Sequence, residues 1–252
     1  MNTSGNGRPS VDIARPPRDP SIDHIHPCRA CDVRQFSVCN VLDAPDLQRL
    51  AEVVTTITLP AHRAVFHEGD PAEHLYNVTS GCVKLYKLLA DGRRQVTGFL
   101  FAGDFLGLAL EDDYAYSAET VSEATLCRFP RRRLERLLED LPKLEKRLLG
   151  NASNELAAAQ DQMILLGRKS AREKIASFLV NLAGRAERRG QPSDPLPLPM
   201  SRTDIADYLG LTTETVSRTF TQLKTQRVIT LLPGGMVALT DRLAIERLAS
   251  GG

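Results

Sequence analysis

The chain has 252 residues, of which 42% are hydrophobic and 25% charged, as in a globular protein with one large or two modest domains. No apolar run approaches the roughly 18 residues that cross a bilayer, and the start of the chain lacks the apolar segment of a secretory signal, so we expect a cytoplasmic protein. The net charge is only +1, but from Arg168 onward thirteen Lys and Arg face eight Asp and Glu, an excess that suits a polyanionic partner.

The first 27 residues and the segment after them differ sharply in character. Residues 1–27 are rich in Gly, Pro, Ser and Asn without a hydrophobic period, which predicts a disordered tail. Cys28, Cys31 and Cys39 follow at C-x2-C-x7-C spacing, in a chain with five cysteines. Because cytosolic reductants keep thiols free, such a cluster indicates metal or redox chemistry more than disulfides.

Short strands are predicted from about residue 55 to Pro130. A short helix near Pro45 precedes apolar runs such as VTTITL, HLYNVTS, CVKLYKLL and ATLCRFP, which are separated by EGD, SG, DG and AGD turns. Many short strands with frequent turn signals are typical of an antiparallel roll or sandwich. We assign residues 28–140 to one domain, made of the cysteine segment and this β-structure.

From Pro130 to Leu182 the pattern is helical and includes a heptad repeat. A narrow apolar seam in which alanines allow close approach is typical of a two-helix interface, and it predicts a dimerisation helix over residues 141–167. The alternative is a helix that packs on its own β-domain. Leu149, Leu156 and Met163 occupy one position of the repeat, and Ala152, Ala159 and Leu166 the other.

Residues 168–252 predict a winged helix-turn-helix. In SRTDIADYLGLTTETVSRTFTQLKTQRVI, a first helix has Ile205 on its apolar face, Gly210 supplies the turn, and Thr212 caps a second helix that buries Val216 and Phe220. The following RVITLLPGGMVALT indicates a two-stranded wing closed by a PGG turn.

A β-roll with GDFLG-type turns, a long interface helix and a winged helix-turn-helix containing ETVSR resembles the CRP/FNR superfamily of bacterial transcription regulators. The leading cysteines and the run QDQMILLGRKSAREKIASFLVNL are similar to its FNR branch. This resemblance implies an α+β fold with a β-roll of the cyclic-nucleotide-binding type. It also implies a homodimeric activator that binds palindromic double-stranded DNA, acts on RNA polymerase and senses oxygen through a [4Fe–4S] cluster. We expect no enzymatic activity.

The cluster needs four thiolates, and the leading segment supplies three. The resemblance implies that Cys127, on a strand before the interface helix, is the fourth, while Cys82 is interpreted as a small buried strand residue. Structural zinc, with His24 or His26 as further ligands, and free thiols of a vestigial site remain alternatives. The x7 spacing is compatible with the branch without being diagnostic, and some FixK-type relatives lack these cysteines.

The same fold can carry other sensor inputs. A cyclic-nucleotide sensor holds its phosphate with an Arg, but this chain has EDDYAYSAET at that point, where Glu111, Asp112 and Asp113 would repel the phosphate. We therefore expect no cyclic nucleotide. A haem or nitric-oxide sensor and a thiol or iron–sulfur redox protein are further alternatives, although neither G-x-G-x-x-G nor G-x4-G-K-[ST] occurs.

The second helix of the motif carries the residues expected to contact DNA. Glu214, Ser217 and Arg218 share one face at i, i+3 and i+4 and can together specify a G·C pair with a neighbour. The alternative is that Glu214 and Arg218 form only a surface ion pair. The FNR branch uses E-x2-S-R on TTGAT half-sites, which implies a TTGAT-N4-ATCAA-like palindrome. Thr212, Thr213 and Lys224 are the expected contacts to the DNA backbone.

Overall fold

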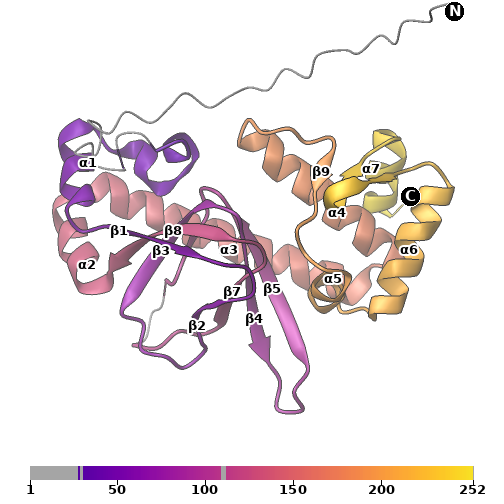
Figure 1. Ribbon diagram of the computed structural model, residues 1–252, viewed down its shortest axis with the longest axis horizontal. Coiled ribbons are helices and arrows are strands. Elements are labelled where there is room, and N and C mark those ends of the chain that lie inside the picture. Colours follow the sequence, from indigo (N-terminus) through magenta and orange to yellow (C-terminus); the bar gives the residue numbers. More distant parts are fainter. Residues whose placement is uncertain (1–27, 29–30, 109–111, 252) are drawn as a thin grey trace, which may run out of the picture.

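The computed structural model describes residue 28 and residues 31–108 and 112–251, so the tail predicted for residues 1–27 lies outside the described residues. It consists of an N-terminal β-roll, a long helix that runs along it, and a C-terminal helical domain with a small sheet (Figure 1). The α+β architecture predicted from the sequence is confirmed. No helix among the described residues is both long and apolar enough to span a bilayer.

Two four-stranded sheets form the β-roll, in the orders β1-β8-β3-β6 and β2-β7-β4-β5, and every pairing in them is antiparallel. The turn at Ser80–Gly81 requires glycine at its second position. A Cβ on Gly81 would lie only 2.1 Å from the carbonyl oxygen of Glu123. The strands are β1 (Thr55–Leu59), β2 (Ala64–Phe66), β3 (His74–Ser80), β4 (Cys82–Leu88), β5 (Arg94–Phe101), β6 (Phe105–Leu106), β7 (Ser117–Thr120) and β8 (Ala124–Pro130).

The first helix begins at a capping signal in the sequence, whereas the two helices that follow it have no side-chain cap at their N-termini. Asp43 caps the first helix by accepting from the Asp46 N–H at 3.0 Å, and strand β8 ends at Pro130. The long helix α3 contains the predicted seam. The helices before the C-terminal domain are α1 (Ala44–Ala51), α2 (Arg131–Asp140) and α3 (Pro142–Arg168).

The C-terminal domain is a winged helix-turn-helix, as the sequence predicts. Gly210 ends the first helix of the motif in the left-handed region, at φ +60°, where glycine is favoured. Strand β9 and helix α7 are two elements that the sequence analysis did not predict, and β9 adds a third strand to the wing sheet, beside β11. The elements are α4 (Ala171–Arg188), β9 (Leu196–Pro197), α5 (Arg202–Leu209), α6 (Thr213–Thr225), β10 (Thr230–Leu232), β11 (Met236–Ala238) and α7 (Arg242–Ser250).

The C-terminal domain packs on the β4–β5 side of the roll. One apolar core is continuous across the junction, because Val96 and Phe99 of β5 belong to the same cluster as Phe178 of α4 and Leu209 of α5. The rings of Phe99 and Phe178 meet edge to face at 6.2 Å. Figure 1 shows α5 beside β5 at this junction. The two domains therefore share buried surface as well as a connecting helix.

A buried set of ion pairs, called here the interdomain clamp, crosses the same junction. Nζ of Lys84, a residue only 3% exposed, lies 2.8 Å from Glu119 and 2.9 Å from Asp204 of α5. Arg94 binds the Asp204 carboxylate at 3.0 Å and that of Asp207 at 2.8 Å. Asp204 also completes the capping box of α5 with Ser201. Burial opposes ionisation of Asp204, but hydrogen bonds from Ser201 and Lys84 outweigh it and hold its pKa below the usual value.

The clamp should contribute more to stability than surface ion pairs do. We expect Lys84→Met to lower the free energy of unfolding by about 3 kcal/mol, because it removes the buried cation that neutralises Glu119 and shares Asp204 with Arg94. Lys87→Met on the same strand is the matched control: Lys87 pairs with Glu68 in solvent, and its loss should cost at most about 1 kcal/mol. Urea denaturation of both variants measures the difference, and equal losses would show that the clamp adds nothing special.

Candidate functional site

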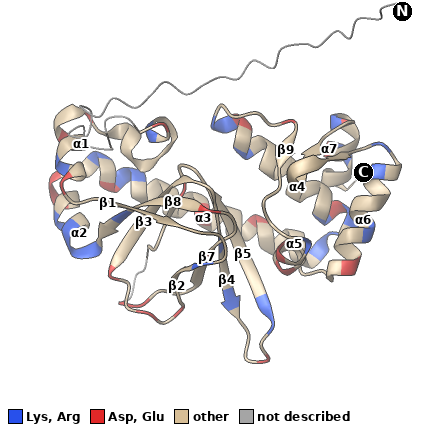
Figure 2. Cartoon of the chain, viewed as in Figure 1, with Lys and Arg blue, Asp and Glu red and all other residues tan. Residues whose placement is uncertain are grey.

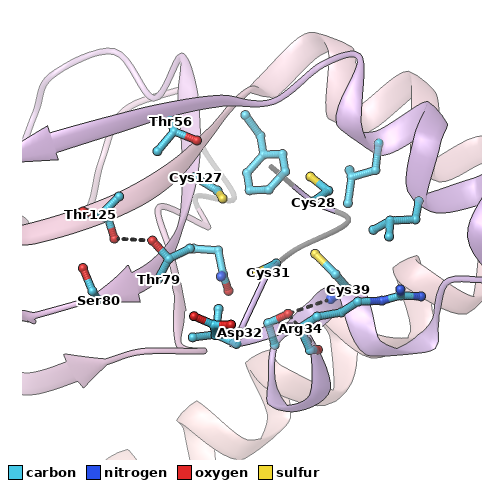
Figure 3. A pocket seen from close by; sticks show the side chains of 16 residues that line it. Cys28, Cys31, Asp32, Arg34, Cys39, Thr56, Thr79, Ser80, Thr125 and Cys127 are labelled. Atoms are coloured by element: carbon cyan, nitrogen blue, oxygen red, sulfur yellow. Dashed lines mark hydrogen bonds between the residues drawn. The ribbon is translucent and has the colours of Figure 1, made fainter. Parts of the chain in front are cut away.

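The three leading cysteines and Cys127 come from distant parts of the sequence and line one cavity. The cavity has a volume of about 320 Å³, and its wall includes Cys28, Cys31, Cys39 and Cys127. Figure 3 shows the first three on the N-terminal segment, facing Cys127 across the cavity. The structure thus brings together all four sulfur atoms that the sequence analysis grouped, including the one assigned by resemblance alone.

The segment that carries the three cysteines, called here the cysteine loop (residue 28 and residues 31–42), is shaped by local structure. Two short 3-10 helices, η2 (Arg34–Phe36) and η3 (Val38–Val41), shape it. Ser37 caps η3 by accepting from the Cys39 N–H at 3.2 Å, and Arg34 donates to the Leu42 carbonyl at 2.7 Å. These bonds fix where Cys39 points.

Apolar contacts attach the cysteine loop to both the roll and α3. Val38 and Leu42 are buried in one cluster with Phe129 of β8 and with Leu144 and Leu148 of α3. Helix η3 accordingly contacts α3 directly. Any ligand that changes the order of the cysteine loop therefore acts next to the N-terminal turns of α3.

Burial makes Cys28, Cys39 and Cys127 hard to ionise on their own. Burial, with smaller contributions from neighbouring thiols, raises the pKa of Cys28 and of Cys39 to about 11. Burial raises the pKa of Cys127 to about 12, and the other three cysteines add to that shift, which shows that they lie within electrostatic range of it. A metal group bound here has to displace these protons, because only a thiolate is a strong metal ligand.

Cys82 lies elsewhere. It is 1% exposed, sits at the start of β4 in the core shared with the C-terminal domain, and is absent from the cavity wall.

In the described part of the chain, no three or more His, Cys, Asp and Glu side chains converge at the spacing of a single metal ion. His24 and His26, the further zinc ligands considered above, lie outside the described residues.

Aromatic side chains pack in the part of the roll where a cyclic nucleotide would be expected. Phe66 and Tyr114 stack with ring centroids 3.7 Å apart, and the Tyr114 hydroxyl donates to the His74 carbonyl at 2.6 Å. The Tyr116 hydroxyl accepts from the Gly107 N–H at 3.1 Å, and Ser117 accepts from the Glu68 N–H at 2.9 Å. These polar groups are already used within the chain. Of the three acids proposed to repel a phosphate, Glu111 lies outside the described residues.

Helix α6 presents the residues expected to contact DNA. Glu214, Ser217 and Arg218 are exposed, while the opposite face of the helix buries Val216 and Phe220. Among the residues that the structure describes, no ion pair joins Glu214 to Arg218. Each side chain is therefore available for contact with another molecule. Hydrogen bonds from its own backbone and from Thr212 hold the pKa of Glu214 below the usual value.

The expected backbone contacts surround this face. Thr212 caps α6 by accepting from the Thr215 N–H at 3.2 Å, and its neighbour Thr213 has its hydroxyl 3.4 Å from that of Thr203. Lys224 is exposed in the last turn of α6. Figure 2 shows this helix at the outer edge of the C-terminal domain, with basic residues along it.

Over most of its length, the predicted seam of α3 has no apolar partner among the described residues. Leu149, Leu156 and Met163 are 68%, 63% and 70% exposed. Ala152 and Ala159 are exposed as well. Leu166 is half-buried because it packs against the turn at Gly210: one of its methyl carbons is 3.4 Å from the position that a Cβ on Gly210 would occupy. Ile164, which the heptad assignment omitted, is 60% exposed.

Sequence reasoning missed two groups of residues. Asn77 lines the thiol cavity, and its only sequence signal is a polar residue within the apolar run HLYNVTS. Lys84 and Asp204 of the clamp gave a similarly weak signal, a charge within CVKLYKLL and an acid within the first helix of the motif. Their partners are distant in sequence, so no local pattern pairs them.

Comparison with known proteins agrees with this architecture. Residues 56–140 match the cyclic nucleotide-binding domain family, and residues 173–248 match the Crp-like helix-turn-helix domain family. The nitrogen fixation regulation protein FixK of Bradyrhizobium diazoefficiens is 43% identical over 92% of this chain and 99% of its own length. The transcriptional activatory protein AadR of Rhodopseudomonas palustris is 42% identical, over 87% of this chain and 92% of its own.

The solved structures give the same picture. FixK2 from Bradyrhizobium japonicum superposes with a TM-score of 0.72 at 37% identity, covering 78% of this chain and 97% of that one. The similarity extends over nearly the full length of these regulators, and both domains occur in the chain, which establishes the protein family. The chain belongs to the CRP/FNR superfamily of DNA-binding transcription regulators, in its FNR and FixK branch, and is not an enzyme.

Proposed function

We propose that this regulator responds to oxygen through a [4Fe–4S] cluster held by Cys28, Cys31, Cys39 and Cys127. The observation that carries the proposal is the meeting of these four thiols in one cavity. Four cysteine thiolates are the usual ligand set of such a cluster. The four thiols come from two separate segments, the cysteine loop and β8, and the cavity of about 320 Å³ between them has room for a group larger than a single ion.

A bound cluster would supply a redox-active group whose integrity depends on oxygen. The chain itself would contribute the attachment between the loop and the roll. When thiols of the cysteine loop and of β8 bind the same group, that group ties the loop to the roll. Val38 of the loop packs in one cluster with Leu144 and Leu148, in the first turns of α3. Ordering of the loop and pairing of α3 can therefore favour the same state of the protein.

The regulator is further proposed to pair through α3 and to bind a TTGAT-N4-ATCAA-like palindrome. A two-fold protein matches a two-fold site, and the unpartnered seam of Leu149, Leu156 and Met163 offers the surface for pairing. Arg218 can donate twice to guanine, and Glu214 can accept from cytosine. Since relatives are named transcriptional activators, RNA polymerase is the expected further partner.

The cluster proposal is tested with matched alanine variants. Anaerobically purified wild-type protein should be brown and hold close to one four-iron cluster per chain by iron and sulfide assay. Cys127→Ala should abolish the visible spectrum, whereas Cys82→Ala, outside the cavity, should keep it. Alanine is used at both positions because it brings no hydroxyl into the buried surroundings of Cys82. Zinc without sulfide, or iron retained by the Cys127 variant, would refute the assignment.

The pairing proposal predicts that a charge in the seam weakens the dimer. Met163→Glu places a carboxylate where two helices would meet, and we expect at least a tenfold rise in the dimer dissociation constant, because an unpaired charge is costly to bury. Asn154→Glu, which places the same charge at an exposed position on the opposite face of the helix, is the control. Analytical ultracentrifugation of anaerobic protein measures both, and an unchanged dissociation constant for Met163→Glu would contradict pairing through this seam.

The DNA proposal predicts two kinds of loss. Arg218→Ala should cost about 1–3 kcal/mol of binding free energy and relax the preference at the guanine, because it removes a base contact. Lys224→Ala should weaken binding to every sequence alike, as loss of a phosphate contact does. Anaerobic gel-shift titrations on the palindrome and its single-base variants separate the two. Uniform losses for Arg218→Ala would make it a phosphate contact instead.

A further inference from the structure

Asn77 is a buried polar residue in the wall of the thiol cavity. It lies in the middle of β3, is 2% exposed, and is the register partner of Cys127 on the neighbouring strand β8. Its surroundings favour an apolar side chain, because Leu75 and Phe129 of the adjoining core are also buried. An asparagine at such a position needs a physical reason.

The side-chain amide of Asn77 is only half satisfied. Its Nδ2 donates to the carbonyl of the next residue, Val78, at 3.4 Å, which is a long bond. Its Oδ1 is buried and has no hydrogen-bond partner among the described residues. A buried amide that leaves one end unpaired destabilises the protein by itself. A ligand in the cavity can supply the missing partner.

The chemistry of the cavity decides which end of the amide that ligand would meet. Sulfur atoms of thiolates and sulfides accept hydrogen bonds and donate none, so an N–H is favourable against them and a carbonyl oxygen is not. A half-turn about the Cβ–Cγ bond exchanges the two ends of the amide, and this torsion is soft in asparagine. Among the described residues, the turn breaks one hydrogen bond of this side chain, the long one to Val78, and it brings Oδ1 toward the Val78 carbonyl, a cost that the new bond to sulfur has to offset.

We propose that Asn77 is a positioning residue for the bound cluster, donating a side-chain N–H to sulfur in the cavity lined by Cys28, Cys31, Cys39 and Cys127. This inference rests on the proposed function and adds a residue to its site. Hydrogen bonds to cluster sulfurs stabilise the more negative, reduced form and so raise the reduction potential, and partners just outside the ligand set help to retain a metal.

Two variants of similar size separate the hydrogen bond from the shape of the side chain. Asn77→Leu removes all polarity, and Asn77→Asp keeps the shape but replaces the donor with a carboxylate. Thr79→Val is the matched control, since Thr79 lies two residues along β3, lines the same cavity, and already uses its hydroxyl on the Thr125 carbonyl at 2.9 Å. Each full-length variant is reconstituted under nitrogen with ferrous iron and sulfide.

Three measurements are then made. Loss of iron to a ferrous chelator should be about tenfold faster for both Asn77 variants than for the wild type, and within about twofold of it for Thr79→Val. The reduction potential should fall in both Asn77 variants and stay in place for Thr79→Val. Without iron, Asn77→Leu should melt at a higher temperature than the wild type, because it removes an unpaired buried polar group.

The outcomes distinguish this inference from the proposed function beneath it. If the wild type takes up no iron and sulfide, both are wrong. If the wild type loads and Asn77→Leu keeps the wild-type iron-loss rate and potential, only the role of Asn77 is refuted, and its amide is satisfied by water. Equal acceleration by Thr79→Val would also refute it, because any change in the cavity wall would then suffice.

Discussion

The carboxylate of Asp204 lies at the junction of the two domains and serves both of them. On its own side it completes the cap of α5, the first helix of the helix-turn-helix. Across the junction it accepts from Lys84 and Arg94, two cations of adjacent strands in the roll. Buried charges of this kind are tolerated only when each has its partners. The orientation of α5, and with it that of α6, is thereby set by the strands of the β-roll.

Figure 1 shows helix α1 at one end of the roll and helix α5 toward the other, with α3 running between them. At one end, Val38 of the cysteine loop packs with the first turns of α3. At the other, Gln162 of α3 donates to the Tyr208 carbonyl of α5 at 2.8 Å. One helix thus contacts the proposed sensing site and the DNA-binding domain through its two ends. Rigid helices that contact two sites provide the contiguous connection through which such sites can be coupled.

Features with a local signature could be predicted from the sequence, and those that depend on distant partners could not. Turn residues such as Gly210 and caps such as Thr212 act within a few residues, so the strands and the helix-turn-helix were predicted. Strand β9 escaped prediction because two residues carry no period and exist as a strand only through pairing with β11. The cysteines were found by spacing and resemblance, whereas Asn77 required the register that sets it beside Cys127.

The exposed strip on α3 also bears on how the regulator responds to its own abundance. Leu149, Leu156 and Met163 are more than half exposed in the single chain, and covering such a strip is favourable because it removes apolar surface from water. For a chain that pairs through it, the concentration of dimers grows with the square of the chain concentration while most chains are single. Occupancy of a promoter then rises more steeply than expression itself, so that a small increase in synthesis produces a disproportionate increase in bound DNA.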